Sequence, residues 1–91
     1  MNRFSGTVIP APTSICPERN AFGHTEYLAS WEFPFACMNV LITRAVDGSF
    51  RPERVTFYAN TVGDNIERRE DYPSDGAFIE CAILNVQARF K

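Results

Sequence analysis

The chain has 91 residues, a formal net charge of −2, 45% hydrophobic residues and 13% aromatic residues. Its length allows one domain with one modest core, so we predict a single domain over residues 1–91. The eight Phe exclude a disordered or low-complexity chain. The acidic balance argues against nucleic acid as a partner, because phosphate contacts need clustered cations.

Signals for a membrane, for secretion and for metal binding are missing from the sequence. No apolar run approaches the roughly 18 residues of a membrane span, and residues 1–10 lack the apolar block of a signal peptide. Cys16, Cys37 and Cys81 are odd in number and form no C-x-x-C pair, so we expect reduced thiols and no zinc site. We therefore predict a soluble cytoplasmic protein with no membrane partner, no metal and no cofactor.

The N-terminal part predicts one strand and one long connection. Residues 3–9 alternate Phe4, Gly6 and Val8 with polar residues, which is the pattern of a half-buried strand. Residues 10–23 contain three prolines, which cannot donate to a strand ladder, so we expect a long loop there.

Residues 26–43 form the most apolar stretch of the first half. Trp31, Phe33 and Phe35 share one parity, and we predict a strand over residues 33–43 in which Pro34 marks an edge or a bulge. Asp47-Gly48 predicts a projecting hairpin loop. Residues 54–60 form the return strand, whose alternation places Tyr58 on the outer face.

The C-terminal third predicts a short helix and a long strand. Residues 61–70 are polar and charged, and Thr61 or Asp64 suits an N-cap. Residues 77–90 are apolar at both parities from Ile79 to Val86, which is typical of a strand buried on both sides and long enough to bend into two pairings. The prediction is therefore an all-β fold, a small five-stranded barrel with one short helix between the third and fourth strands. So much apolar surface also predicts a homodimer or a higher homo-oligomer.

No motif of enzyme chemistry is present. His24 is the one histidine, and the chain has no G-x-S-x-G elbow, no phosphate-binding glycine loop and no metal-ligand spacing. We expect no catalytic residues, so the protein is not predicted to be an enzyme.

Aromatic and arginine residues carry the remaining functional signal. Eight of the nine basic residues are Arg, which suits forked phosphate contacts and base stacking. Single-strand binding needs flat rings on which bases stack, together with cations that follow the backbone. Tyr27, Phe50, Tyr58 and Tyr72 are the candidates for exposed rings. The predicted nucleic-acid-binding residues are Tyr58, Phe50, Arg44, Arg51, Arg54 and Tyr27.

The order of these elements resembles that of single-stranded DNA-binding proteins with an oligonucleotide-binding (OB) barrel. Residues 2–8, 35–43 and 53–58 look like the family's first three strands, residues 44–51 like its projecting hairpin, residues 61–69 like its helix and residues 76–81 like its glycine-led fourth strand. The resemblance implies non-sequence-specific binding of single-stranded nucleic acid and a role in DNA replication. Asp75-Gly76 stands where the family has Lys-Gly, and no acidic tail follows Lys91. These departures favour a minimal member encoded by a phage or plasmid and acting inside the host cell.

We therefore predict non-sequence-specific binding of single-stranded DNA or RNA by aromatic stacking and Arg–phosphate contacts. The alternative is a small protein-interaction or inhibitory module, whose acidic and aromatic surface docks onto a protein partner. Protein interfaces also favour Tyr, Trp, Phe and Arg, so composition does not separate the two functions.

Overall fold

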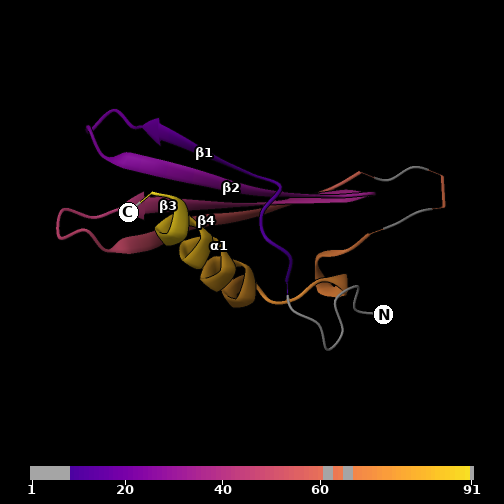
Figure 1. The fold of residues 1–91 in the computed structure, drawn as a ribbon. Coiled ribbons are helices and arrows are strands. Elements are labelled where there is room, and N and C mark those ends of the chain that lie inside the picture. Colours follow the sequence, from indigo (N-terminus) through magenta and orange to yellow (C-terminus); the bar gives the residue numbers. More distant parts are fainter. Residues whose placement is uncertain (1–8, 61–62, 65–66, 91) are drawn as a thin grey trace.

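The computed structural model describes residues 9–60, 63–64 and 67–90, and they form two layers. One layer is an antiparallel four-stranded sheet, and the other is a C-terminal helix that lies across one of its faces (Figure 1). The strands follow one another in space as they do in sequence, in the order β1-β2-β3-β4. The elements are β1 (Ser14–Arg19), β2 (Thr25–Phe33), β3 (Ala36–Arg44), β4 (Phe50–Ala59), the 3-10 turn η1 (Arg69–Asp71) and the helix α1 (Asp75–Arg89).

The apolar stretch predicted as one central strand is two strands joined by a tight turn. Phe33 pairs with Ala36, so Pro34 and Phe35 form the connection between β2 and β3. Proline suits the first central position of a turn because its φ is already fixed near the required value. The turn also changes the parity of the buried face, since Trp31 on β2 and Met38 on β3 are paired and both buried. The predicted edge or bulge at Pro34 is therefore wrong.

The predicted β3–β4 hairpin is confirmed. Gly48 has a φ of 89°, which favours glycine, and the Ala45 amide donates to the Ser49 carbonyl at 2.7 Å. Asp47 closes the loop as a hydrogen-bond acceptor for Ser49, at 2.9 Å from its amide and 2.6 Å from its hydroxyl. A register irregularity at Leu41/Ile42 inserts one extra residue into β4.

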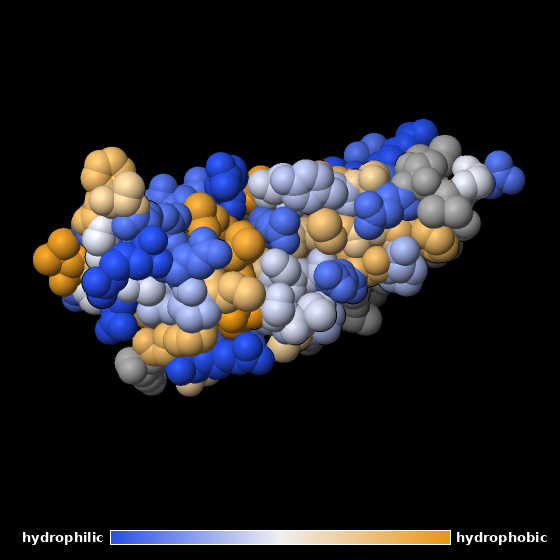
Figure 2. All heavy atoms as spheres, turned by 90° about the horizontal axis from the view of Figure 1, so that it is seen from above, coloured by the Kyte–Doolittle hydropathy of each residue, from blue (hydrophilic) through white to orange (hydrophobic). Residues whose placement is uncertain are grey.

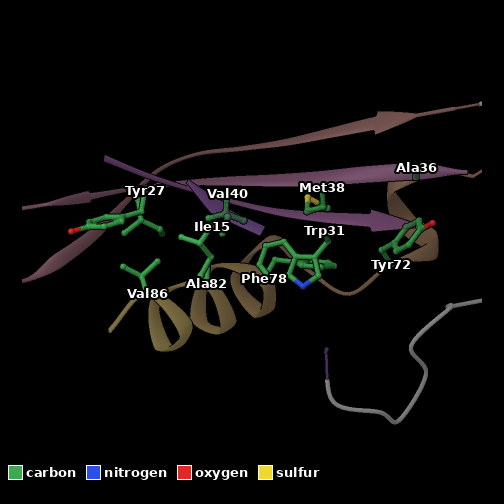
Figure 3. Packing of buried hydrophobic residues seen from close by; sticks show 12 residues of the cluster. Ile15, Tyr27, Trp31, Ala36, Met38, Val40, Tyr72, Phe78, Ala82 and Val86 are labelled. Atoms are coloured by element: carbon green, nitrogen blue, oxygen red, sulfur yellow. The ribbon is translucent and has the colours of Figure 1, made fainter. Parts of the chain in front are cut away.

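The core lies between α1 and the sheet. Ser74 caps the helix, because its side chain accepts a hydrogen bond from the Ala77 amide. Phe78, Ala82 and Val86 recur every four residues and are fully buried against the sheet (Figure 3). The ring of Phe78 meets the ring of Trp31 edge to face, with centroids 5.1 Å apart. The remaining buried apolar residues are Ile15, Tyr27, Ala29, Ala36, Met38, Val40, Ile42 and Tyr72.

The fold is mainly β, as predicted, but the described residues form an open sheet and not a closed five-stranded barrel. The predicted last strand, residues 77–90, is the helix α1, because its apolar positions also satisfy a helical repeat and Ser74 supplies a cap. The predicted long loop over residues 10–23 contains β1. Apart from Ile9, the predicted opening strand lies outside the described residues. The predicted helix over residues 61–70 is only partly described, and there η1 begins at Arg69.

The helices in residues 9–60, 63–64 and 67–90 are unsuited to span a membrane. None of the helices there has the length and apolar character needed to cross a bilayer.

The packing predicts unequal effects for two truncations in the same helix. Phe78→Ala should lower the free energy of unfolding by about 3–5 kcal/mol, because it opens a cavity beneath Trp31. Leu84→Ala should change it by less than about 0.5 kcal/mol, because the Leu84 side chain is exposed. Urea denaturation followed by circular dichroism measures both, and equal losses would contradict this account of the core.

Candidate functional site

The face of the sheet turned away from α1 has no second layer among the described residues, and we call it the open face. Side chains alternate across a strand, so the neighbours of the buried positions point to this face. Three cross-strand rows define it: Leu28–Leu41–Arg54, Ser30–Asn39–Thr56 and Glu32–Cys37–Tyr58. Seen from above, hydrophilic and apolar side chains are interspersed over the molecule (Figure 2). The open face is therefore neither a buried core face nor a uniformly charged surface.

Two shallow hollows adjoin on the open face and share Leu41 and Arg54. The smaller, of about 190 Å³, is lined by Leu28, Asn39, Leu41, Arg54, Thr56 and Tyr58. The larger, of about 400 Å³, is lined by Asn20, Phe22, His24, Glu26, Leu41, Thr43, Glu53 and Arg54. The Tyr58 residue is 53% exposed and Phe22 is 85% exposed. Arg54 thus lies between two hollows, each of which has one exposed aromatic ring.

Phe22 reaches this position through the loop between β1 and β2. The Asn20 side chain accepts hydrogen bonds from the amides of Phe22, at 2.9 Å, and His24, at 3.0 Å. Gly23 has a φ of 79°, which completes the tight turn. Sequence reasoning missed Phe22 because it placed the residue in a long loop. The available signal was Asn20 followed by Gly23, which is a turn pattern between two strands.

The six predicted binding residues lie on two different faces of the sheet. Arg54 and Tyr58 lie on the open face, and Arg51 lies opposite Thr43 in a third hollow of about 440 Å³, which also contains His24, Val46 and Asp47. Thr43 lines both this hollow and the larger of the other two. Three of the six residues are therefore brought together along β4.

Tyr27, Phe50 and Arg44 lie on the other side of the sheet, toward α1. Tyr27 is buried, with its ring centroid 4.9 Å from that of Phe90 and 5.8 Å from that of Phe50. The Arg44 guanidinium lies 5.4 Å from the centroid of the Phe50 ring and donates to the Phe90 carbonyl at 3.3 Å. The expected exposure of Tyr27 is wrong, and so is that of Tyr72, which is also buried. The buried rings of Tyr27 and Tyr72 have no free face on which a base could stack.

Charges on the open face are segregated by strand. Glu18 lies directly opposite Glu26 across β1 and β2, and Glu32 is on the same face of β2. Arg51 and Arg54 are both on β4. The β4 side of the face is therefore its cationic side, although Glu53 lies between the two arginines in sequence.

Other reactive side chains give no assembled centre. Among the described residues, no group of three or more His, Cys, Asp or Glu side chains is placed to hold a metal ion. Burial raises the pKa of the Cys81 thiol, while a hydrogen bond from Asn85 opposes that rise. Cys16 is exposed and Cys37 is half-buried. A thiol whose pKa is raised is a weak nucleophile near neutral pH, and Cys81 packs half-buried against the core.

Neither a known protein family, nor a curated protein, nor a solved structure matches the chain. The open face itself is therefore the basis of the function proposed below.

The loop between β3 and β4, which contains Asp47 and Ser49, gives a pH-dependent prediction. The hydrogen bonds from Ser49 lower the pKa of the Asp47 carboxyl below its usual 3.8. A carboxyl whose pKa is lower in the folded state than in the unfolded state stabilises the protein at pH values above its unfolded-state pKa. This stabilisation is lost as the pH falls through the folded-state pKa. In a carbon-13 NMR titration, Asp47 should have a midpoint below 3.8, and Ser49→Ala should raise it.

The same substitution should lower thermal stability near neutral pH more than in strong acid, where the carboxyl is protonated in both proteins. Asp75, whose carboxylate pairs with Arg69 and not with this loop, provides the control resonance. An unchanged Asp47 midpoint in Ser49→Ala would contradict the assigned cause of the shift.

Proposed function

We propose that the open face binds single-stranded DNA or RNA with little sequence preference. The observation that carries this proposal is the position of Arg54 between two adjoining hollows, one with the exposed ring of Tyr58 and the other with the exposed ring of Phe22. Exposed rings let bases stack, and an arginine between them reaches the phosphate that links two stacked bases. The proposal keeps the stacking and cation chemistry implied by the resemblance to single-stranded DNA-binding proteins, but assigns it to an open sheet.

The proposed path of the strand follows β4. Arg51 and Arg54 supply the cations along this strand, while Glu18, Glu26 and Glu32 repel phosphates from the opposite side of the face. Asn39 on β3 and Thr56 on β4 lie opposite each other, in the row between those of Arg54 and Tyr58. They offer amide and hydroxyl groups to sugars or base edges. Stacking on any base and contacts to the backbone carry no sequence information, which is why low selectivity is expected.

A protein-interaction module is the second candidate, and one observation favours it. Phe22 and Val46 are 85% and 96% exposed, and their two loops project at the same end of the molecule, on the left of Figure 1. Acidic Glu26, Asp47 and Glu53 line the hollows beside them. Apolar side chains rimmed by carboxylates suit a basic protein partner.

Removal of the Tyr58 ring tests the stacking. Tyr58→Ala should weaken binding of a fluorescent mixed-sequence oligonucleotide by about 1–3 kcal/mol, measured by anisotropy at low salt. Tyr58→Phe keeps the ring and should bind as the unaltered protein does, and Leu84→Ala, an exposed position on α1, should also leave binding unchanged. If no oligonucleotide binds to the unaltered protein at low salt, the nucleic-acid proposal fails and the protein-interaction candidate takes its place.

Removal of the Arg54 charge tests the phosphate contact separately. Arg54→Gln should lower the slope of log affinity against log salt concentration by about 0.7, the value for one phosphate contact on a single strand. Arg89→Gln is the matched control, because Arg89 is exposed in the last turn of α1, away from the open face. An equal change in slope for both variants would indicate a general charge effect and not a contact at this site.

A further inference from the structure

Within the part of the chain that the structure describes, no strand pairs with the outer edge of β4, which we call its free edge. Among the described residues, β4 pairs with β3 alone. The Asn60 amide donates to the Phe35 carbonyl at 2.7 Å, and backbone groups alternate in direction along an antiparallel strand. The even-numbered residues 54–58 therefore turn their amides and carbonyls toward β3. The residues that turn theirs to the free edge are Val55, Phe57 and Ala59.

The other edge of the sheet is protected against pairing. The Asn20 amide donates to the His24 carbonyl at 2.9 Å, so the same alternation places the backbone nitrogen of Pro17 at the free edge of β1. Proline has no amide hydrogen, and a proline in the middle of an edge strand interrupts any new ladder. On β4 the one proline is Pro52, near the start of the strand, and residues 54–59 follow the extra residue Glu53 with no further proline or register shift. The two edges therefore differ in their capacity to accept another strand.

We propose that a second copy of this chain pairs with the free edge of β4, antiparallel, about a two-fold axis that passes at Thr56. The pairing joins the two four-stranded sheets into one continuous sheet, with both α1 helices on the same face. Each Val55 and the partner's Phe57 then exchange backbone hydrogen bonds, since both turn their amides and carbonyls to the edge.

The side chains favour this register. With the axis at Thr56, Val55 lies opposite the partner's Phe57, which is a favourable β-branched–aromatic pair. On the open face, Arg54 lies opposite the partner's Tyr58, which is a cation–π pair. Moving the axis to Val55 would place Glu53 against the partner's Phe57, and moving it to Phe57 would place Arg54 opposite the partner's Asn60 in place of its Tyr58.

A hollow beside this edge provides a second, independent observation. It has a volume of about 260 Å³, lies between β4 and the start of α1, and is lined by Pro52, Glu53, Arg54, Val55, Asp75 and Ile79. Val55, Phe57 and Ile79 pack against the core but are only half-buried. In the proposed pair the partner's Phe57 lies opposite Val55, beside the hollow, so the second copy covers apolar surface that one copy leaves exposed.

Pairing would also reorganise the open face. It brings the Arg51, Arg54 and Tyr58 side chains of both copies to the middle of the joined sheet and leaves Glu18, Glu26 and Glu32 of each copy on its outer half. The pairing does not rest on the proposed function, because it depends only on the strand edge and its side chains. It is therefore tested without nucleic acid.

Size-exclusion chromatography with light scattering tests the pairing. The unaltered protein should have twice the mass of one 10.3 kDa chain at micromolar concentration. Thr56→Lys places two ammonium groups opposite each other at the axis and should give a monomer with an unchanged circular dichroism spectrum, since like charges directly opposite destabilise a strand pair. Ser30→Lys makes the same change on the open face of β2, away from the axis, and should leave the dimer intact.

A cross-link tests the register. Residues at the axis form a pair without backbone hydrogen bonds, with Cα atoms about 4.5 Å apart, which is close enough for a disulfide. In a Cys16→Ser background, Thr56→Cys should form a covalent dimer on mild oxidation and Ser30→Cys should not. A monomeric unaltered protein would overturn the proposal. A dimer that survives Thr56→Lys, or that fails to cross-link through Thr56→Cys, would overturn pairing through β4.

Discussion

The packing of one face of α1 on one face of the sheet is the interaction on which the rest of the structure depends. Four strands in simple succession have no second sheet among the described residues to cover them, and Trp31, Met38 and Val40 are removed from water chiefly by Phe78, Ala82 and Val86 of α1. Burial of each large side chain contributes about 1.5–3 kcal/mol. The same packing decides which side of the sheet stays open, because α1 covers one face and no described element covers the other. Both candidate surfaces, the open face and the β4 edge, are consequences of how little a single helix can cover.

Local sequence predicted the features that depend on one turn or one alternation. The Asp47-Gly48 hairpin and the outward position of Tyr58 both follow from patterns of a few residues, and both are found. Residues 77–90 were assigned to the wrong element because apolar residues at both parities fit a doubly buried strand and a buried helix equally well. The Ser74 cap distinguishes the two in the structure, yet Ser74-Asp75-Gly76 also reads as a turn in the sequence. Pro34 similarly marked an interruption without revealing that the chain reverses there.

The candidate site was only half predictable, because its composition depends on contacts between distant residues. The ring of Tyr27 packs against Phe90, just after α1, and the ring of Phe50 contacts Arg44 and Tyr27. These are tertiary contacts, which no local sequence pattern indicates. Phe22 joins the site because Asn20 and Gly23 fold its loop back beside β3 and β4. Arg54 and Tyr58 were correctly grouped because four residues along one strand keep the same face. Strand periodicity thus identifies which residues share a face, but not whether another element covers that face.

A net charge of −2 describes the whole chain, whereas a bound strand responds to charges near it. Glu26 on β2 and Arg51 on β4 are separated by β3, which is two strand spacings or about 10 Å. This distance is about one Debye length at physiological salt (about 8–10 Å), so salt weakens the repulsion that the acids of β1 and β2 exert on phosphates along β4, although Glu26 lines the same hollow as Arg54. Pairing through β4 would set four arginines from two chains at the centre of one sheet and leave the carboxylates of β1 and β2 on its outer halves. The acidic composition and a cationic binding strip are then compatible, because the order of strands in the sheet separates the two kinds of charge.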